Sequence, residues 1–137
     1  MAMTTDKMVL QPAGWAAPRG YANGVATSGR QVFVAGQIGW NAQCEFESDD
    51  FIAQVRQALL NIKAVLAEAG AAPAHIVRMT WYLLDKREYV ARGREIGQAY
   101  REVLGTEYQI AMSAVQVAGL IEDRAKVEIE VTAVVPQ

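Results

Sequence analysis

The stretch KVEIEVTAVV, residues 126–135, decides the fold, because its apolar and polar residues alternate with the two-residue period of a β-strand. Its apolar side chains fall on one face, and Lys126, Glu128, Glu130 and Thr132 fall on the other. Glutamate is depleted in strands and is costly to bury without a partner. The face that carries Glu128 and Glu130 is therefore either exposed to water or part of a binding site.

The residues before this strand predict more β-structure. The stretch IAMSAVQVAGL, residues 110–120, predicts a strand that forms a hairpin with residues 126–135. Near the N-terminus, residues 20–26 and 31–38 predict a second hairpin, turned at residues 27–30.

Two helices are expected. Apolar residues recur at steps of three and four over residues 51–69, which follow a polar cap and precede Gly70. The second helix is predicted over residues 86–104, and its apolar stripe includes Gly93 and Gly97. Each of these glycines costs roughly 1 kcal/mol relative to alanine in an exposed helix. We therefore expect a tightly packed neighbour there.

Residues 76–84 predict a strand that is apolar on both faces. Val77, Met79, Trp81 and Leu83 fall on one face, and Tyr82 and Leu84 fall on the other. Two helices cover one face of a sheet, so the other face is expected to meet another subunit or to remain exposed. The order β-β-β-α-β-α-β-β predicts a single α+β domain over residues 1–137, with helices on one sheet face.

Composition and charge exclude several classes of protein. A chain of 137 residues with 52% hydrophobic and 20% charged residues is typical of a globular domain. Its net charge of -2 gives no attraction to nucleic acid or to anionic membranes. Cys44 is the single cysteine and His75 the single histidine, so neither a disulfide nor a zinc site is expected. His75 follows Pro73 and Ala74 at the start of a predicted strand, and we expect it to be exposed. Residues 1–19 predict an irregular lead-in with one short strand and no export signal, which favours a cytoplasmic protein without a metal or cofactor.

Three segments resemble the Rid family, also called YjgF, whose small trimeric members in many cases hydrolyse enamines and imines to ketones and ammonia. They are AGQI at residues 35–38, NIKAVL at residues 61–66 and VEIE at residues 127–130, and the similarity runs from about Tyr21 to Val135. The resemblance implies the chorismate-mutase-like YjgF fold, with a mixed sheet and two helices on one face. It also implies a homotrimer that binds small molecules in pockets between subunits, with no nucleic-acid or membrane partner.

The resemblance also assigns roles to particular residues. Glu128 matches the first glutamate of a Glu-x-Glu motif that lies near bound ligand, so we expect it to hold or activate a water molecule as a general base. The alternative is a solvated strand carboxylate. Glu130 is expected to face solvent or to form a salt bridge. Tyr21 matches a tyrosine that lines the pocket in the family, although a half-buried edge aromatic is the alternative. Gly36 and Ser113 could offer backbone N–H groups to a ligand.

The sequence departs from the family at the position where deaminating members grip the substrate carboxylate with arginine. Met112 stands there, and a thioether offers only dispersion and a weak acceptor. Ala114 stands where many members have cysteine or threonine. Arg92, Arg94 and Arg101 flank the stripe of the second helix. They are either solvated charges or, in a trimer, a source of the missing positive charge for a neighbour's pocket.

Two functions remain open at this point. The first is a hydrolase, or deaminase, of small imines or enamines, with a substrate altered because Met112 replaces the arginine. The alternative is a trimer of the same fold that binds a small metabolite without turning it over. A ribonuclease label attached to some relatives has little support, because the chain is acidic, has one histidine and lacks a basic aromatic surface.

Overall fold

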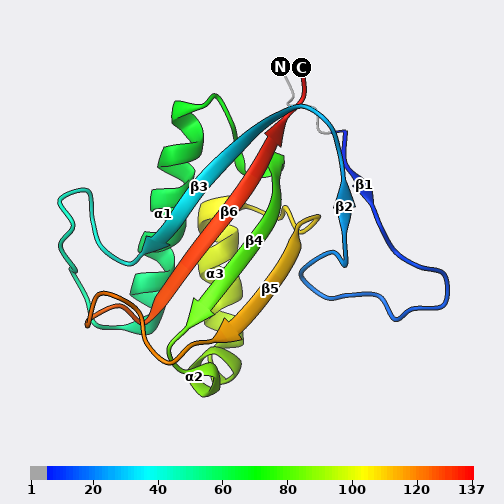
Figure 1. Cartoon of the computed structure of the whole chain (residues 1–137). Coiled ribbons are helices and arrows are strands. Elements are labelled where there is room, and N and C mark those ends of the chain that lie inside the picture. The colour runs from blue at the N-terminus through cyan, green and yellow to red at the C-terminus, as the bar shows by residue number, and fades with distance from the viewer. Residues whose placement is uncertain (1–5) are drawn as a thin grey trace.

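The computed structural model describes residues 6–137 and places three helices on one face of a four-stranded mixed sheet (Figure 1). The strands are β3 (Arg30–Ile38), β4 (Ile76–Leu83), β5 (Ala111–Gln116) and β6 (Val127–Val135). They lie in the order β3-β6-β4-β5, so β6 pairs with two neighbours. β6 is antiparallel to both β3 and β4, whereas β5 is parallel to β4. The predicted α+β architecture is confirmed.

The helices are α1 (Phe51–Glu68), α2 (Lys86–Ala91) and α3 (Gly93–Leu104). A short 3-10 helix, Pro73–His75, leads into β4. α1 and α3 pack side by side behind the sheet (Figure 1). None of the helices found within residues 6–137 is both long enough and apolar enough to cross a bilayer.

The alternation predicted for the C-terminal strand is present in β6. Its helix-facing side chains are all buried: Val127, Ile129, Val131 and Ala133. Glu128, Glu130 and Thr132 point away from the helices and remain partly exposed. The strand thus separates a dry face from a polar outer face, and burial of the apolar set fixes its register.

The boundaries of α1 also agree with the sequence. The carboxylate of Asp50 caps the helix by accepting a hydrogen bond of 3.0 Å from the backbone N–H of Ala53. Gly70 follows the helix with φ of +68°, a left-handed conformation that a glycine adopts without strain. A polar residue is buried on this helix as well. The Gln54 amide donates to the Arg124 carbonyl and accepts from the Lys126 N–H, which ties α1 to the loop before β6.

Both predicted hairpins are wrong. β2 (Val25–Ala26) pairs with β1 (Met8–Val9) in a separate two-stranded sheet, and β3 pairs with β6 instead. At the other end of the chain, β4 lies between β5 and β6. The parallel pairing of β5 with β4 requires a crossover, which α2 and α3 supply.

Two local predictions also need correction. The second helix is interrupted at Arg92, so α2 and α3 are separate segments. His75, expected to be exposed, is buried with 3% of its surface accessible, and its Nδ1 accepts a hydrogen bond from the Ala72 N–H at 3.0 Å. This imidazole closes the short turn before β4 because the 3-10 helix leaves that N–H without a backbone partner.

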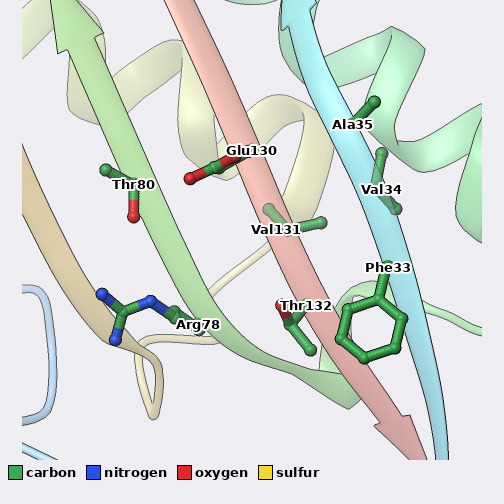
Figure 2. A pocket seen from close by; sticks show the side chains of 8 residues that line it. All are labelled: Phe33, Val34, Ala35, Arg78, Thr80, Glu130, Val131 and Thr132. Carbon is green, nitrogen blue, oxygen red and sulfur yellow. The ribbon is translucent and has the colours of Figure 1, made fainter.

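The outer face of the sheet is more polar than the sequence suggested. On β4 the residues facing away from the helices are Arg78, Thr80 and Tyr82, and a bulge at Val77 interrupts the register between β4 and β6. Figure 2 shows this face, where a hollow of about 400 Å³ is lined by Arg78, Thr80, Glu130, Phe33 and their strand neighbours. Phe33 is 71% exposed. The outer face therefore carries the aromatic ring of Phe33 together with a positive charge, Arg78, and a negative charge, Glu130.

Candidate functional site

Glu128 lies on the outer face of β6, beside the backbone of β3. A Cβ atom placed on Gly36 would lie 2.7 Å from the carboxyl carbon of Glu128, so the carboxylate occupies the space above that glycine. The same side chain lines a hollow of about 270 Å³ together with Tyr82, Leu120 and Ile121. The structure therefore brings Glu128 and Gly36 together, and both are among the residues proposed for the site.

The two glutamates of β6 differ in their partners. The Tyr82 hydroxyl donates a hydrogen bond of 2.6 Å to Glu130 Oε1, and this bond raises the pKa of Tyr82. We expected Glu130 to face solvent or to form an ion pair, and it is instead held by a tyrosine. The Glu128 carboxylate forms no hydrogen bond or ion pair with any other side chain within residues 6–137. Of the two, Glu128 is the carboxylate that no other side chain among these residues holds.

Met112 lies on the opposite face from Glu128. On β5 it is the register partner of Met79, whose side chain is fully buried beneath the helices, and it packs against the same core. Glu128 is the register partner of Tyr82 on the outer face. Side chains paired across a ladder share a face of the sheet. One copy of the chain therefore cannot present Met112 and Glu128 to the same small ligand.

The neighbours of Met112 divide in the same way. Ser113 pairs with Thr80 and shares the outer face with Glu128. Ala114 pairs with Trp81 and shares the helix-facing side with Met112. The predicted site residues of β5 thus contribute to both faces.

Tyr21 lies beyond the free edge of β5. The neighbouring Ala22 forms an isolated bridge with Ala111, and its N–H donates to the Ile110 carbonyl at 2.9 Å. Tyr21 is 41% exposed, and the adjacent Gly20 lines a hollow that Met112 also lines. Tyr21 therefore lies near the edge of the hollow that Met112 lines, and not beside Glu128.

The Met112 hollow lies between α3 and the sheet and has a volume of about 270 Å³. Its wall includes four aromatic side chains: Trp81, Tyr89, Tyr100 and Tyr108. Burial raises the pKa values of Tyr89 and Tyr100, which keeps both phenols neutral in the ordinary pH range.

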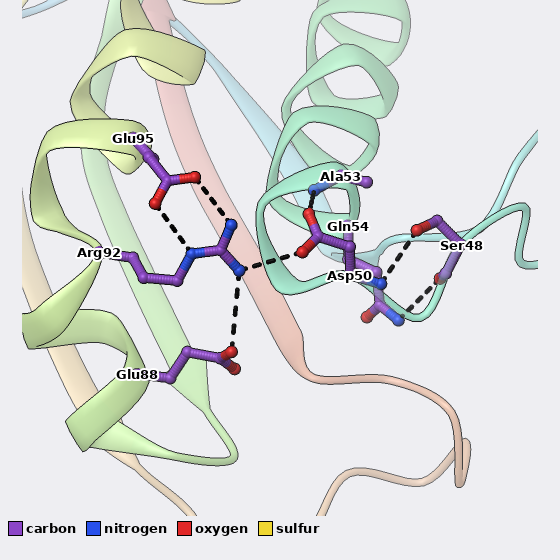
Figure 3. A network of polar contacts seen from close by, with 7 residues as sticks. All are labelled: Ser48, Asp50, Ala53, Gln54, Glu88, Arg92 and Glu95. Atoms are coloured by element: carbon purple, nitrogen blue, oxygen red, sulfur yellow. Dashed lines mark hydrogen bonds and ion pairs between the residues drawn. The ribbon is translucent and has the colours of Figure 1, made fainter.

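Arg92 is held by carboxylates and is not available to a ligand (Figure 3). Its guanidinium forms two hydrogen bonds with Glu95, of 2.7 and 3.1 Å, and one of 3.0 Å with Asp50 on α1. Glu88 lies 3.8 Å away. This network ties the break between α2 and α3 to the N-terminus of α1, so Arg92 has a structural role.

The other two candidate arginines differ in position. Arg94 is exposed on α3 and lines neither the Glu128 hollow nor the Met112 hollow. Arg101 lines the Met112 hollow of its own chain, together with Arg19, which no motif or periodic pattern singles out. Arg19 lies in the irregular segment before β2, where no periodic pattern indicates a direction for its side chain.

The two helical glycines have different surroundings. A Cβ on Gly97 would lie 3.1 Å from Arg101 Nη1, so the guanidinium lies against this glycine. A Cβ on Gly93 would meet nothing within 4 Å, so the expected tight neighbour is absent there. Gly97 thus provides the space in which Arg101 folds back along α3.

Metal ligands do not gather in the part of the chain that the structure describes. Residues 6–137 contain no group of three or more histidine, cysteine, aspartate or glutamate side chains placed to hold a metal ion. Cys44 is exposed in the loop after β3.

Comparisons with known proteins agree with this architecture. The chain matches the profile of the family described as Endoribonuclease L-PSP over residues 13–135. It is 34% identical over 106 residues to a RutC family protein of Pasteurella multocida, covering 77% of this chain and 81% of that protein. It is also 34% identical over 109 residues to the 2-iminobutanoate/2-iminopropanoate deaminase of Salmonella typhimurium, covering 77% of this chain and 80% of the relative.

Solved structures extend the similarity to the whole fold. The crystal structure of YyfB from Yersinia pestis, a Rid family protein of unknown function, superposes with a TM-score of 0.79 at 33% identity. That match covers 95% of this chain and 99% of YyfB. The YjgF fold expected from the sequence is therefore confirmed, and the chain belongs to the Rid (YjgF) family.

Proposed function

We propose that this protein hydrolyses small reactive imines or enamines to ketones and ammonia, in pockets between the subunits of a cytoplasmic homotrimer. The observation that carries the proposal is the free carboxylate of Glu128, which lies over Gly36 at the edge of a hollow. A relative that bears the name of an imine deaminase supports this class of reaction.

In the proposed mechanism, Glu128 accepts a proton from a water molecule as the water oxygen attacks the imine carbon. The C=N double bond becomes a C–N single bond, and the nitrogen gains a proton. The carbinolamine then collapses: the proton of its hydroxyl passes to the amino nitrogen, the C–O single bond becomes a C=O double bond, and the C–N bond breaks as ammonia leaves. One water is consumed and one ketone and one ammonia are formed, so no redox cofactor is required.

The opposite orientations of Met112 and Glu128 favour a pocket shared by two copies. A substrate that contacts the Met112 side of one chain can meet a Glu128 carboxylate only if a second chain supplies it. The exposed Phe33 and the charged side chains around it give the outer sheet face a surface that a second copy could cover.

Met112 supports an altered substrate. Its thioether cannot form the two parallel charge-assisted hydrogen bonds with which a guanidinium holds a carboxylate. The substrate is therefore either uncharged at that point or held through another cation.

The proposal is tested by generating imines in situ from several amino acids with an amino-acid oxidase and measuring ammonia release. The protein should accelerate release above the spontaneous rate. Glu128→Gln should reduce that acceleration by about a hundredfold or more, since it keeps the shape of the side chain and removes its basicity. Glu130→Gln is the matched control on the same strand and face, and it should retain activity because its amide oxygen can still accept from Tyr82.

Two results would count against the proposal. If Glu128→Gln is as active as the unmodified protein, Glu128 does not activate the water. If no imine is turned over faster than in buffer, and a metabolite still stabilises the protein against heat in a saturable way, the chain is a binding protein of the same fold.

A further inference from the structure

The Met112 hollow contains the elements of an anion site that Met112 itself does not provide. Arg19 and Arg101 line the same hollow, and neither guanidinium forms an ion pair or a side-chain hydrogen bond within residues 6–137. Arg92, which directly precedes the lining residue Gly93, is by contrast paired with three carboxylates. The positive charge of Arg19 and Arg101 is therefore left for a ligand.

Gly97 sets the direction of Arg101. Since a Cβ at residue 97 would lie 3.1 Å from Arg101 Nη1, the guanidinium rests on the helix surface where a side chain is missing. A glycine in the interior of α3 weakens the helix by roughly 1 kcal/mol relative to alanine. In return, the absence of a side chain at residue 97 gives the Arg101 guanidinium room to lie there and to line the hollow.

The deep wall of the hollow is aromatic and includes Trp81, which is 2% exposed. Its indole Nε1 has no hydrogen-bond partner among residues 6–137 and is itself buried, so what Trp81 adds to the wall is apolar surface. Around Trp81, Tyr89 packs edge-on at 6.0 Å, while Tyr100 and Tyr108 stack at 5.3 Å between ring centroids.

We propose that this hollow binds monocarboxylates with an aromatic or bulky apolar side chain, and that Arg101, assisted by Arg19, holds the carboxylate. The ring or alkyl group then lies among the tyrosines and Met112, where dispersion and burial of apolar surface favour it. This inference rests on the proposed function, for which it names the substrate class: 2-imino acids with a large apolar side chain.

In this proposal the arginine that holds the carboxylate lies on α3, whereas deaminating members of the family have it on β5, at the position of Met112. Arg101 reaches the hollow from the exposed side of the helix, whereas Met112 lies in the wall formed by the sheet. The exchange leaves the middle of the hollow apolar and places the cations at its rim. A small 2-imino acid would leave the aromatic wall uncovered, and a large one would fill it.

The inference is tested by calorimetry with inert probes, so that its outcome does not depend on turnover. We expect 3-phenylpropanoate to bind at least about tenfold more tightly than propanoate, which lacks the aromatic ring. We expect the same difference from 3-phenylpropanamide, which lacks the charged carboxylate. Arg101→Met should weaken binding of 3-phenylpropanoate by about ten- to a hundredfold and leave binding of the amide unchanged. Arg94→Met is the matched control on the same helix, and it should bind the acid as the unmodified protein does.

Three results would overturn the inference: no binding of 3-phenylpropanoate, equal affinity for the acid and its amide, or an Arg101→Met variant with unchanged affinity. The Glu128→Gln variant separates this inference from the proposed function. It should bind 3-phenylpropanoate normally while losing turnover. Binding with no hydrolysis by the unmodified protein would leave the anion site in place and refute the catalytic proposal.

Discussion

The carboxylate of Glu128 lies directly against the backbone of Gly36, in the space that a side chain at residue 36 would need. Replacing Gly36 with alanine should therefore push the carboxylate aside. We expect Gly36→Ala to reduce imine hydrolysis by about as much as Glu128→Gln, a hundredfold or more, because a displaced base no longer reaches the water. Steady-state assays on both variants check this.

A double-mutant cycle shows whether the effect comes from this contact. If the collision with Glu128 is the only cost of the new methyl group, Gly36→Ala should lower the melting temperature less in a Glu128→Ala background than alone. An equal loss in both backgrounds would mean that the glycine is required for the backbone of β3 and not for the position of Glu128.

Gly97→Ala should have opposite effects on stability and on binding. The substitution should stabilise α3 by up to about 1 kcal/mol, because alanine is the better helix former. The new methyl group would shift the flexible end of Arg101 by a few tenths of an ångström, so we expect affinity for 3-phenylpropanoate to fall if the guanidinium must lie against Gly97 to hold the carboxylate. Urea denaturation and calorimetry on one preparation measure both quantities. A stabilised variant with unchanged affinity would show that Arg101 does not need Gly97.

The Arg92 network should make stability depend on acid pH. Hydrogen bonding to Arg92 lowers the pKa of Glu95 from its ordinary value of 4.5. The pKa of Asp50 is lowered from 3.8, first by the hydrogen bond from the Ala53 N–H and then by Arg92. Groups whose folded pKa is depressed stabilise the protein above their unfolded pKa, and that contribution is lost as the pH falls through the folded pKa.

Arg92→Met should therefore destabilise the protein near neutral pH, with an effect that is complete above about pH 5. The difference from the unmodified protein should shrink as the pH falls through the lowered pKa values of Asp50 and Glu95, because both carboxylates then become protonated. Urea midpoints of the two proteins across this range provide the measurement. A difference that stays constant down to the lowest pH would mean that Arg92 acts by packing and not through its charge.

Met112→Arg should place a charged hydrogen-bond donor for a ligand carboxylate in the wall of the hollow. A hydrogen bond to a charged group is worth roughly 1.5–3 kcal/mol, so binding of 2-oxobutanoate should tighten by about ten- to a hundredfold. Its neutral amide should gain little, and added salt should weaken the gain. If the folded variant binds 2-oxobutanoate no better than before, residue 112 does not face the ligand.

Individual helices and strands could be predicted because they depend on the spacing of apolar residues over short stretches of sequence. The alternation of β6 and the apolar stripe of α1 are fixed by which residues must be buried, and both are present. Strand pairing could not be predicted in the same way. The insertion of β4 between β5 and β6 depends on contacts far apart in the sequence, which a turn motif does not encode.

The candidate site was predicted in part for a similar reason. The contact of Glu128 with Gly36 joins two strands that the resemblance had already singled out. The opposite orientation of Met112 depends on its register with Met79, which the sequence alone does not provide. Arg101 was considered only for a neighbouring subunit, because its approach to its own hollow depends on how the side chain turns across Gly97.

Subunit complementation tests the central claim, that Glu128 of one copy acts on a substrate held by the Met112 hollow of another. Glu128→Gln and Arg101→Glu chains would be mixed one to one, unfolded and reassembled, with native mass spectrometry to verify mixed trimers. Each variant alone should be nearly inactive at low substrate concentration. The mixture should regain about a quarter of the unmodified activity, because each pocket draws its two halves independently from the two kinds of chain. Activity no greater than the mean of the two inactive variants, in verified mixed trimers, would contradict a site shared between copies.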